Sequence, residues 1–309
     1  MSDNAVPAPL LAASARSRAA REGRLAWMLM LPASLAFVLM LLLPTLAALA
    51  LAFTDYEMGA PDWHWIGLAN FREMTGDPAF RQSLRNTIVF VGLTTPAAFI
   101  GGLGLALAIE RCRRGRTFFR AVFFLPVVSL TAAMAAAWQY LLHPMIGPVN
   151  ALLHLVGIPG PLWLSSAASV LGSLAGIATW GNIGFNMVLF MAGLTTIPRE
   201  LYAAAEVDGA RSGWAKFWLV TWPLLGPTSL FVLTITLVRA LTSSFDLVTV
   251  MTQGGPDNAS AVLLFTLYQQ GFTYFRLGYA AAITLVFLVI VVGVTWAQNA
   301  LLDRRVHYG

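Results

Sequence analysis

The chain contains six long apolar runs, each of the length that a helix needs to cross a lipid bilayer. A transmembrane helix requires roughly 20 predominantly apolar residues. The runs cover residues 26–53, 87–109, 118–141, 170–193, 225–250 and 277–300. None of them alternates polar and apolar residues in the manner of a membrane β-strand. The runs therefore predict an all-α, polytopic membrane protein with about six transmembrane helices.

The first run is too long for the apolar region of a cleaved signal peptide, which covers roughly 7–15 residues. Four arginines precede it within residues 1–24. We therefore expect the run to remain as a spanning helix. The chain is then divided into an N-terminal arm (1–24), a transmembrane domain (25–303) and a short tail (304–309).

Basic side chains are concentrated in alternate connections between the runs. Fourteen of the 19 lysines and arginines lie in the N-terminal arm, the second and fourth connections and the tail, whereas the connections on the other side hold four. The positive-inside rule then predicts that both termini are cytoplasmic, in a multi-pass protein of a bacterial-type inner membrane. This distribution explains the net charge of +5 by membrane orientation, so we expect no nucleic-acid partner.

The fourth connection, residues 197–224, is polar and is predicted to be cytoplasmic. Pro198 and Glu200 suit the first turn of a helix, and the three alanines that follow favour helix formation. Gly209 suits a helix stop with positive φ. These signals predict a short helix over 199–208, followed by an amphipathic segment over about 212–222.

Sequence motifs for nucleotide binding and for common catalytic sites are missing. The chain has no GxxxxGK[ST] motif, and its four histidines lack the spacing of metal ligands. A single cysteine, Cys112, excludes an intramolecular disulfide framework. We therefore expect no enzyme activity, metal or cofactor in this chain. If it moves a solute, the energy comes from an ion gradient or from a partner protein.

The polar connection resembles the EAA loop of permease subunits in binding-protein-dependent ABC importers. The closest resemblance is to the carbohydrate-uptake branch, which includes the maltose and glycerol-3-phosphate systems. The matching loop residues are IP (197–198), ELY (200–202), AA (204–205), DGA (208–210), Phe217, Thr221, PLL (223–225) and Pro227. Further matching segments are residues 65–87, 119–128, 245–260 and 278–282. One departure is that Ala203 stands where the family has its naming glutamate, with Glu206 nearby.

The resemblance implies that the short helix is a coupling helix that docks on a cytoplasmic ATPase. The residues it implicates in that contact are Glu200, Ala204, Ala205, Glu206, Asp208, Gly209 and Ala210. It also implies a second homologous permease subunit, two ATPase subunits that bind ATP and Mg²⁺, and an external solute-binding protein. The solute would be a sugar or a related polyol or glycerol-phosphate compound.

Five polar residues inside the spans are candidates for the translocation path, because such groups usually face a bundle interior or a wet cavity. Arg239, Ser243 and Asp246 share one face of the fifth span, and Asn182 and Asn186 share one stripe of the fourth. The alternative for Arg239 and Asp246 is a pair that fixes helix register. The alternative for the two asparagines is interhelical hydrogen bonding. Gly176, Gly181 and Gly184 are predicted to allow close helix approach.

Two other functions remain open from the residues alone. An ion-gradient-driven secondary transporter would show an internal repeat and usually more spans. A non-transporting membrane scaffold would not need the polar connection at 197–224.

Overall fold

The computed structural model describes residues 26–112 and 114–303, and no β-strand is present within these ranges. A continuous first helix, Ala26–Leu51, includes η1 (Val38–Leu42) and α2 (Leu43–Leu51). The remaining helices are α3 (Ala69–Gly76), α4 (Pro78–Arg111), α5 (Arg116–Val128), α6 (Thr131–Leu141), α7 (Pro148–Leu155), α8 (Val170–Thr195), α9 (Arg199–Val207), α10 (Gly213–Lys216), η2 (Phe217–Thr221), α11 (Trp222–Leu224), α12 (Gly226–Met251), α13 (Leu263–Tyr268), η3 (Gln269–Thr273) and α14 (Leu277–Asp303).

Five of the six predicted spans are confirmed as helices long and apolar enough to cross a membrane. They are the first helix, α4, α8, α12 and α14. The second span is longer than expected, because α4 begins at Pro78 rather than near residue 87, with Asp77 as its N-cap. The Asp77 carboxylate accepts a 2.8 Å hydrogen bond from the backbone N–H of Ala79. Residues 78–86 are therefore part of α4 rather than of the connection before it.

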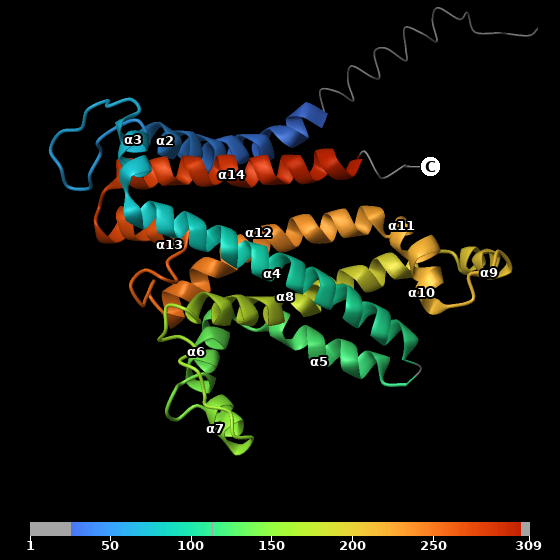
Figure 1. The fold of residues 1–309 in the computed structure, drawn as a ribbon. Coiled ribbons are helices and arrows are strands. Elements are labelled where there is room, and N and C mark those ends of the chain that lie inside the picture. The colour runs from blue at the N-terminus through green and yellow to red at the C-terminus, as the bar shows by residue number, and fades with distance from the viewer. Residues whose placement is uncertain (1–25, 113, 304–309) are drawn as a thin grey trace, which may run out of the picture.

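The run predicted to span the membrane at 118–141 is not one continuous helix, although its two parts together are long and apolar enough for one broken span. This run forms two helices, α5 and α6, whose axes are bent by 99°. Pro126 lies in the last turn of α5, where it supplies no N–H to the helix, and Ser129 and Leu130 adopt extended backbone conformations. In Figure 1, α6 and α7 extend away from the main bundle.

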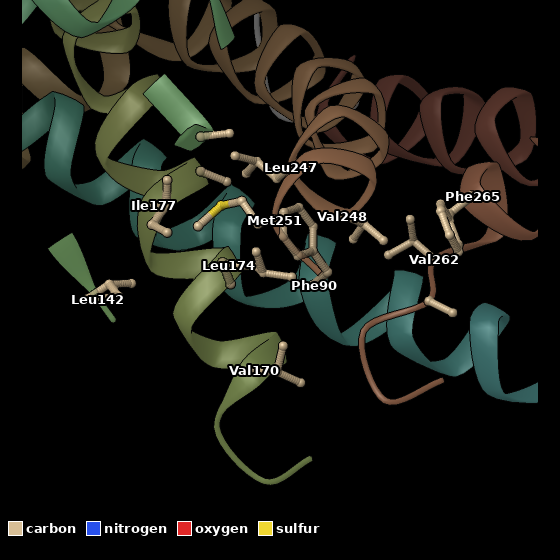
Figure 2. Close-up of a cluster of buried hydrophobic side chains, with 14 residues drawn as sticks. Phe90, Leu142, Val170, Leu174, Ile177, Leu247, Val248, Met251, Val262 and Phe265 are labelled. Atoms are coloured by element: carbon tan, nitrogen blue, oxygen red, sulfur yellow. The ribbon is translucent and has the colours of Figure 1, made fainter. Parts of the chain in front are cut away.

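The central packing joins α4, α8 and α12. One buried cluster contains Phe90 of α4, Leu174 of α8 and Leu247 of α12, all with no accessible surface (Figure 2). Val262, at the N-cap of α13, and Phe265, within α13, close the cluster. Because residues far apart in sequence supply this core, α8 and α12 are held in fixed relation to each other.

Gly184 allows the backbones of α5 and α8 to come into contact, which agrees with the prediction that this glycine permits close helix approach. A Cβ atom at this position would lie 1.9 Å from the carbonyl oxygen of Phe123. The same prediction is wrong for Gly176, where a Cβ atom would meet nothing within 4 Å. A Cβ atom at Gly181 would meet only the side chain of Met134, at ordinary contact distance.

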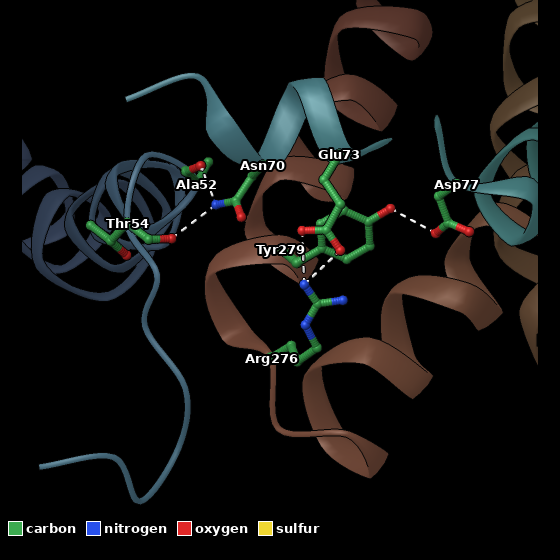
Figure 3. Close-up of polar contacts among 7 residues, drawn as sticks. All are labelled: Ala52, Thr54, Asn70, Glu73, Asp77, Arg276 and Tyr279. Carbon is green, nitrogen blue, oxygen red and sulfur yellow. Dashed lines mark hydrogen bonds and ion pairs between the residues drawn. The ribbon is translucent and has the colours of Figure 1, made fainter. Parts of the chain in front are cut away.

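The first helix lies beside α14, at the edge of the bundle (Figure 1). None of the residues in its most apolar stretch is buried. Its far end is held by Asn70 of α3, whose side-chain amide donates 2.9 Å hydrogen bonds to the carbonyls of Ala52 and Thr54 (Figure 3).

The α3 helix is in turn attached to α14. Arg276 donates hydrogen bonds of 2.7 and 2.9 Å to the two carboxylate oxygens of Glu73. The Tyr279 hydroxyl donates a 2.7 Å hydrogen bond to Asp77 (Figure 3). These contacts connect the first helix, α3 and α14 at the end of the bundle opposite α9 and α10 (Figure 1).

Candidate functional site

Four of the five predicted intramembrane residues line one cavity. Asn182 of α8 and Arg239, Ser243 and Asp246 of α12 all contribute to its wall, and its volume is about 190 Å³. The remaining lining residues are Pro126, Val127, Ser129, Thr131, Met134, Ala178, Gly181, Thr242 and Leu247. The cavity therefore lies between α8, α12 and the bend that separates α5 from α6.

Arg239 is held by two partners from α8. Its Nε donates a 2.9 Å hydrogen bond to Oδ1 of Asn182, and its guanidinium lies 4.5 Å from the centroid of the Phe185 ring. Asn182 is 4% exposed, and its amide nitrogen donates a 2.8 Å hydrogen bond to the carbonyl of Ala178. Both polar atoms of the Asn182 amide are thus engaged, and the arginine is positioned by α8 rather than by its own helix.

Asp246 lies on the same face of α12 as Arg239 and is exposed in this chain. Within the described residues, no nitrogen of Arg239 lies within 4.0 Å of the Asp246 carboxylate, so the two do not form a direct ion pair. The cavity consequently presents a cation, a carboxylate and the Ser243 hydroxyl as separate groups. Such a set can form hydrogen bonds with several hydroxyls of one solute.

Asn186, the fifth predicted residue, lies outside the cavity. Its side chain is fully buried, and its Oδ1 accepts a 2.9 Å hydrogen bond from the Thr236 hydroxyl of α12. A Cβ atom at Gly102 of α4 would lie 2.5 Å from the Asn186 Cβ. Asn186 therefore joins three packed helices, which matches the alternative of interhelical hydrogen bonding.

Three polar cavity residues were not expected from the sequence. Ser129 and Thr131 flank the bend between α5 and α6, and Thr242 belongs to α12. The proline at position 126, followed by a serine and a threonine inside an apolar run, was the available signal for a broken span.

The polar connection folds as the sequence predicts. The short helix α9 covers Arg199–Val207, with Pro198 at its N-cap. Gly209 follows with φ of 95°, a conformation that side-chain-bearing residues rarely adopt. The second segment consists of α10, η2 and α11, and leads into α12. In Figure 1, α9 projects beyond the ends of the spanning helices.

Glu206 of α9 forms an ion pair with Lys216 at a distance of 2.8 Å. The hydrogen bond and the charge of Lys216 hold the pKa of the Glu206 carboxyl below its usual range. Its carboxylate therefore connects α9 to α10 within the loop. Tyr202 makes a second connection, since its hydroxyl lies 3.1 Å from the Thr221 hydroxyl.

The chain has the sequence pattern of a known family over most of its length. Residues 87–308 match the family model described as binding-protein-dependent transport system inner membrane component. The chain belongs to this family. Its predicted relationship to permease subunits of ABC importers is thereby confirmed.

Similar proteins support this assignment along nearly the whole chain. The sn-glycerol-3-phosphate transport system permease protein UgpA of Agrobacterium fabrum is 35% identical over 247 residues, which are 80% of this chain and 83% of that protein. The probable ABC transporter permease protein YesP of Bacillus subtilis is 34% identical over 299 residues, 95% of each chain.

The fold is also found among solved structures. A chain of a bacterial ABC transporter involved in the import of the acidic polysaccharide alginate superposes with a TM-score of 0.81, covering 93% of this chain and 98% of that one at 24% identity. Membership of the family decides between the three functions left open above. This permease is an inner-membrane component of an ABC importer, and it is neither a secondary transporter nor a scaffold.

Proposed function

We propose that this permease forms one half of a translocation path for a sugar or a related polyol or glycerol-phosphate solute. The observation that carries the proposal is the cavity shared by Asn182, Arg239, Ser243 and Asp246. Donors and acceptors placed separately around a small cavity suit a hydroxyl-rich solute, because each buried hydroxyl needs a partner. A second homologous permease subunit supplies the other half of the path.

The charges around the cavity favour a neutral solute over a phosphorylated one. Among the described residues, Arg239 is the one cation in the cavity wall, and its Nε is already bonded to Asn182. Asp246 lines the same wall and would repel a phosphate group. Asn186 takes a supporting role, because it fixes α8 against α12 beside the path.

Transport is driven through α9, which acts as the coupling helix. Its side chains are largely exposed, with no residue buried in this chain, as a docking surface requires. Glu200, Ala204, Ala205, Glu206, Asp208, Gly209 and Ala210 form or support the contact with one ATPase subunit. Two such ATPase subunits bind ATP and Mg²⁺, and an external solute-binding protein delivers the solute on the opposite side.

This arrangement requires α9 and both chain termini to be cytoplasmic, as the distribution of basic residues favours. Residues 1–25 and 304–309 lie outside the described part of the chain, so the orientation rests on the sequence. Cysteine-accessibility labelling tests it: with Cys112 replaced by serine, a cysteine in place of Ser212, beside α10, should react only with a membrane-permeant reagent in intact cells.

The proposed coupling is tested by co-purification. The solubilised permease should associate with its ATPase subunits in a manner that depends on ATP. A permease that shows no such association would exclude the docking role of α9. The solute is identified separately, by thermal shift of the external binding protein against a panel of neutral sugars, polyols and glycerol phosphates. A stabilising shift with glycerol phosphates alone would contradict the preference for a neutral solute.

A further inference from the structure

A second cavity lies at the opposite end of α4 from its N-cap, beside the loop that follows α9. Its volume is about 480 Å³, and it is formed between α4 and the α10–η2 segment. The lining residues are Gly104, Leu107, Ala108, Arg111, Gly213, Trp214 and Phe217. The cavity shares no lining residue with the one that contains Arg239.

One wall of this cavity is a single stripe of α4. Gly104, Leu107, Ala108 and Arg111 stand at i, i+3, i+4 and i+7, and therefore lie on one helix face. A Cβ atom at Gly104 would meet nothing within 4 Å, so the apolar end is open. The first three residues of the stripe are apolar. The fourth, Arg111, is the last residue of α4 and is exposed.

The opposite wall is aromatic. The Trp214 and Phe217 rings are stacked, with centroids 6.0 Å apart, and the indole of Trp214 is 72% exposed. Trp218 and Trp222 continue the aromatic surface along the same segment. Tryptophans with this exposure are typical of the headgroup level of a membrane, where an amphipathic ring contacts both lipid and water.

The charge of the cavity is positive. No carboxylate lines it within the described part of the chain. Nearby Lys216 is paired with Glu206 and Arg116 with Glu110, whereas Arg111 forms no ion pair with a described carboxylate. The Arg111 guanidinium lies next to Gly213, where a Cβ atom would come within 3.3 Å of its Nη2. Arg111 therefore points across the mouth of the cavity toward α10.

We propose that this cavity binds an anionic glycerophospholipid of the bilayer. The lipid phosphate contacts Arg111, and an acyl chain lies along Leu107, Ala108 and Gly104 between the stripe and Phe217. Basic cavities between spanning helices at the headgroup level are suited to anionic lipid headgroups. Because the lipid touches both α4 and α10, it connects a spanning helix to the segment that follows the coupling helix.

Native mass spectrometry of the full chain in detergent tests the proposal, with phosphatidylglycerol as the probe and phosphatidylcholine as the neutral comparison. Arg111→Gln should lower the affinity for phosphatidylglycerol roughly fivefold, the effect of one cation at an anionic membrane surface. Arg120→Gln is the matched control, since Arg120 is exposed in the same basic region but does not line the cavity. Equal losses in both variants would overturn the proposal.

A second pair of variants tests the acyl-chain contact without altering charge. Gly104→Leu fills the apolar end of the cavity and should lower phosphatidylglycerol binding, whereas Gly92→Leu, at an open position of α4 outside the cavity, should not. Unchanged binding in Gly104→Leu would contradict the proposed pose. Displacement of phosphatidylglycerol by millimolar inorganic phosphate would identify a free-phosphate site instead and would also overturn the proposal.

Discussion

The Nε of Arg239 in α12 donates a 2.9 Å hydrogen bond to the side-chain oxygen of Asn182 in α8. This bond places a guanidinium at the wall of a cavity inside the bundle, with the ring of Phe185 beneath it. A charged side chain in a span is costly unless it has a partner or reaches water. Arg239 has both, because it is half-buried and its cavity is polar.

Replacing Asn182 with alanine should leave the guanidinium without its acceptor. A hydrogen bond to a charged group contributes about 1.5–3 kcal/mol to stability. We expect Asn182→Ala to lower the free energy of unfolding by that amount and to reduce solute uptake, as measured by thermal unfolding in detergent and by transport in proteoliposomes. Asn182→Asp keeps the acceptor for Arg239 and loses only the hydrogen bond to the Ala178 carbonyl, so it should retain most of the stability. A loss equal to that of Asn182→Ala would show that the hydrogen bond from Arg239 contributes little.

Asp246 should be needed for transport rather than for folding. Its carboxylate is exposed to the cavity and is not paired with Arg239. We expect Asp246→Asn to change the free energy of unfolding by less than about 0.5 kcal/mol, as is usual for substitutions away from packed features. Uptake by the reconstituted importer should fall at least tenfold. Wild-type uptake in this variant would remove Asp246 from the path.

The spans and the coupling helix could be predicted from local sequence, because hydropathy, helix starts and a glycine stop are local signals. The break between α5 and α6 was missed, since the run at 118–141 is apolar enough to read as one span and only Pro126, Ser129 and Thr131 mark the bend. For Asn186, the sequence offered both a place in the translocation path and an interhelical hydrogen bond, and it could not decide between them. Asn186 shares a helical stripe with Asn182, yet its partner Thr236 is 50 residues away and is known only once α8 and α12 are packed.

Close packing of α5 against α8 should depend on Gly184. A methyl group there would lie 1.9 Å from the Phe123 carbonyl oxygen, which belongs to backbone and cannot rotate away. Gly184→Ala should therefore lower the free energy of unfolding by about 3 kcal/mol, at the upper end of overpacking costs. An added methyl group at Gly176, on the same helix, has no atom within 4 Å. Gly176→Ala should therefore change the free energy of unfolding by no more than about 1 kcal/mol. Thermal unfolding of the two purified variants compares them directly, and similar midpoints would refute the difference.

Gly209 should be essential for coupling because proline cannot adopt its φ of 95°. We expect Gly209→Pro to insert into the membrane normally and to abolish solute-stimulated ATP hydrolysis in the assembled importer. Gly59 is a matched control, since it has φ of 91° and open surroundings in the connection before α3. Gly59→Pro should distort that connection while leaving docking of α9 intact. Normal stimulation in Gly209→Pro would mean that the loop is not the mechanical link.

The Glu206–Lys216 ion pair should show a defined pH dependence. The pKa of Glu206 is lowered in the folded protein, so its contribution is complete above the usual glutamate value of 4.5 and is lost as the pH falls through the lower folded-state value. At pH 7, Glu206→Gln should increase hydrogen exchange of the α9 backbone amides. At each pH the wild type is compared with the variant under the same conditions, because amide exchange itself varies with pH. The two proteins should become equally protected only below pH 4.5. Equal protection of the two between pH 5 and 7 would contradict the assignment.

The first helix differs from the other spans in having no buried residue along its most apolar stretch. It is attached to the remaining bundle by its position beside α14 and by the hydrogen bonds of Asn70 at its far end. Few of its side chains therefore have to fit against neighbouring side chains of this chain, so one apolar residue can replace another with little effect on the fold. The contribution of this segment to the permease therefore depends on its overall apolarity and length rather than on the identity of any one side chain.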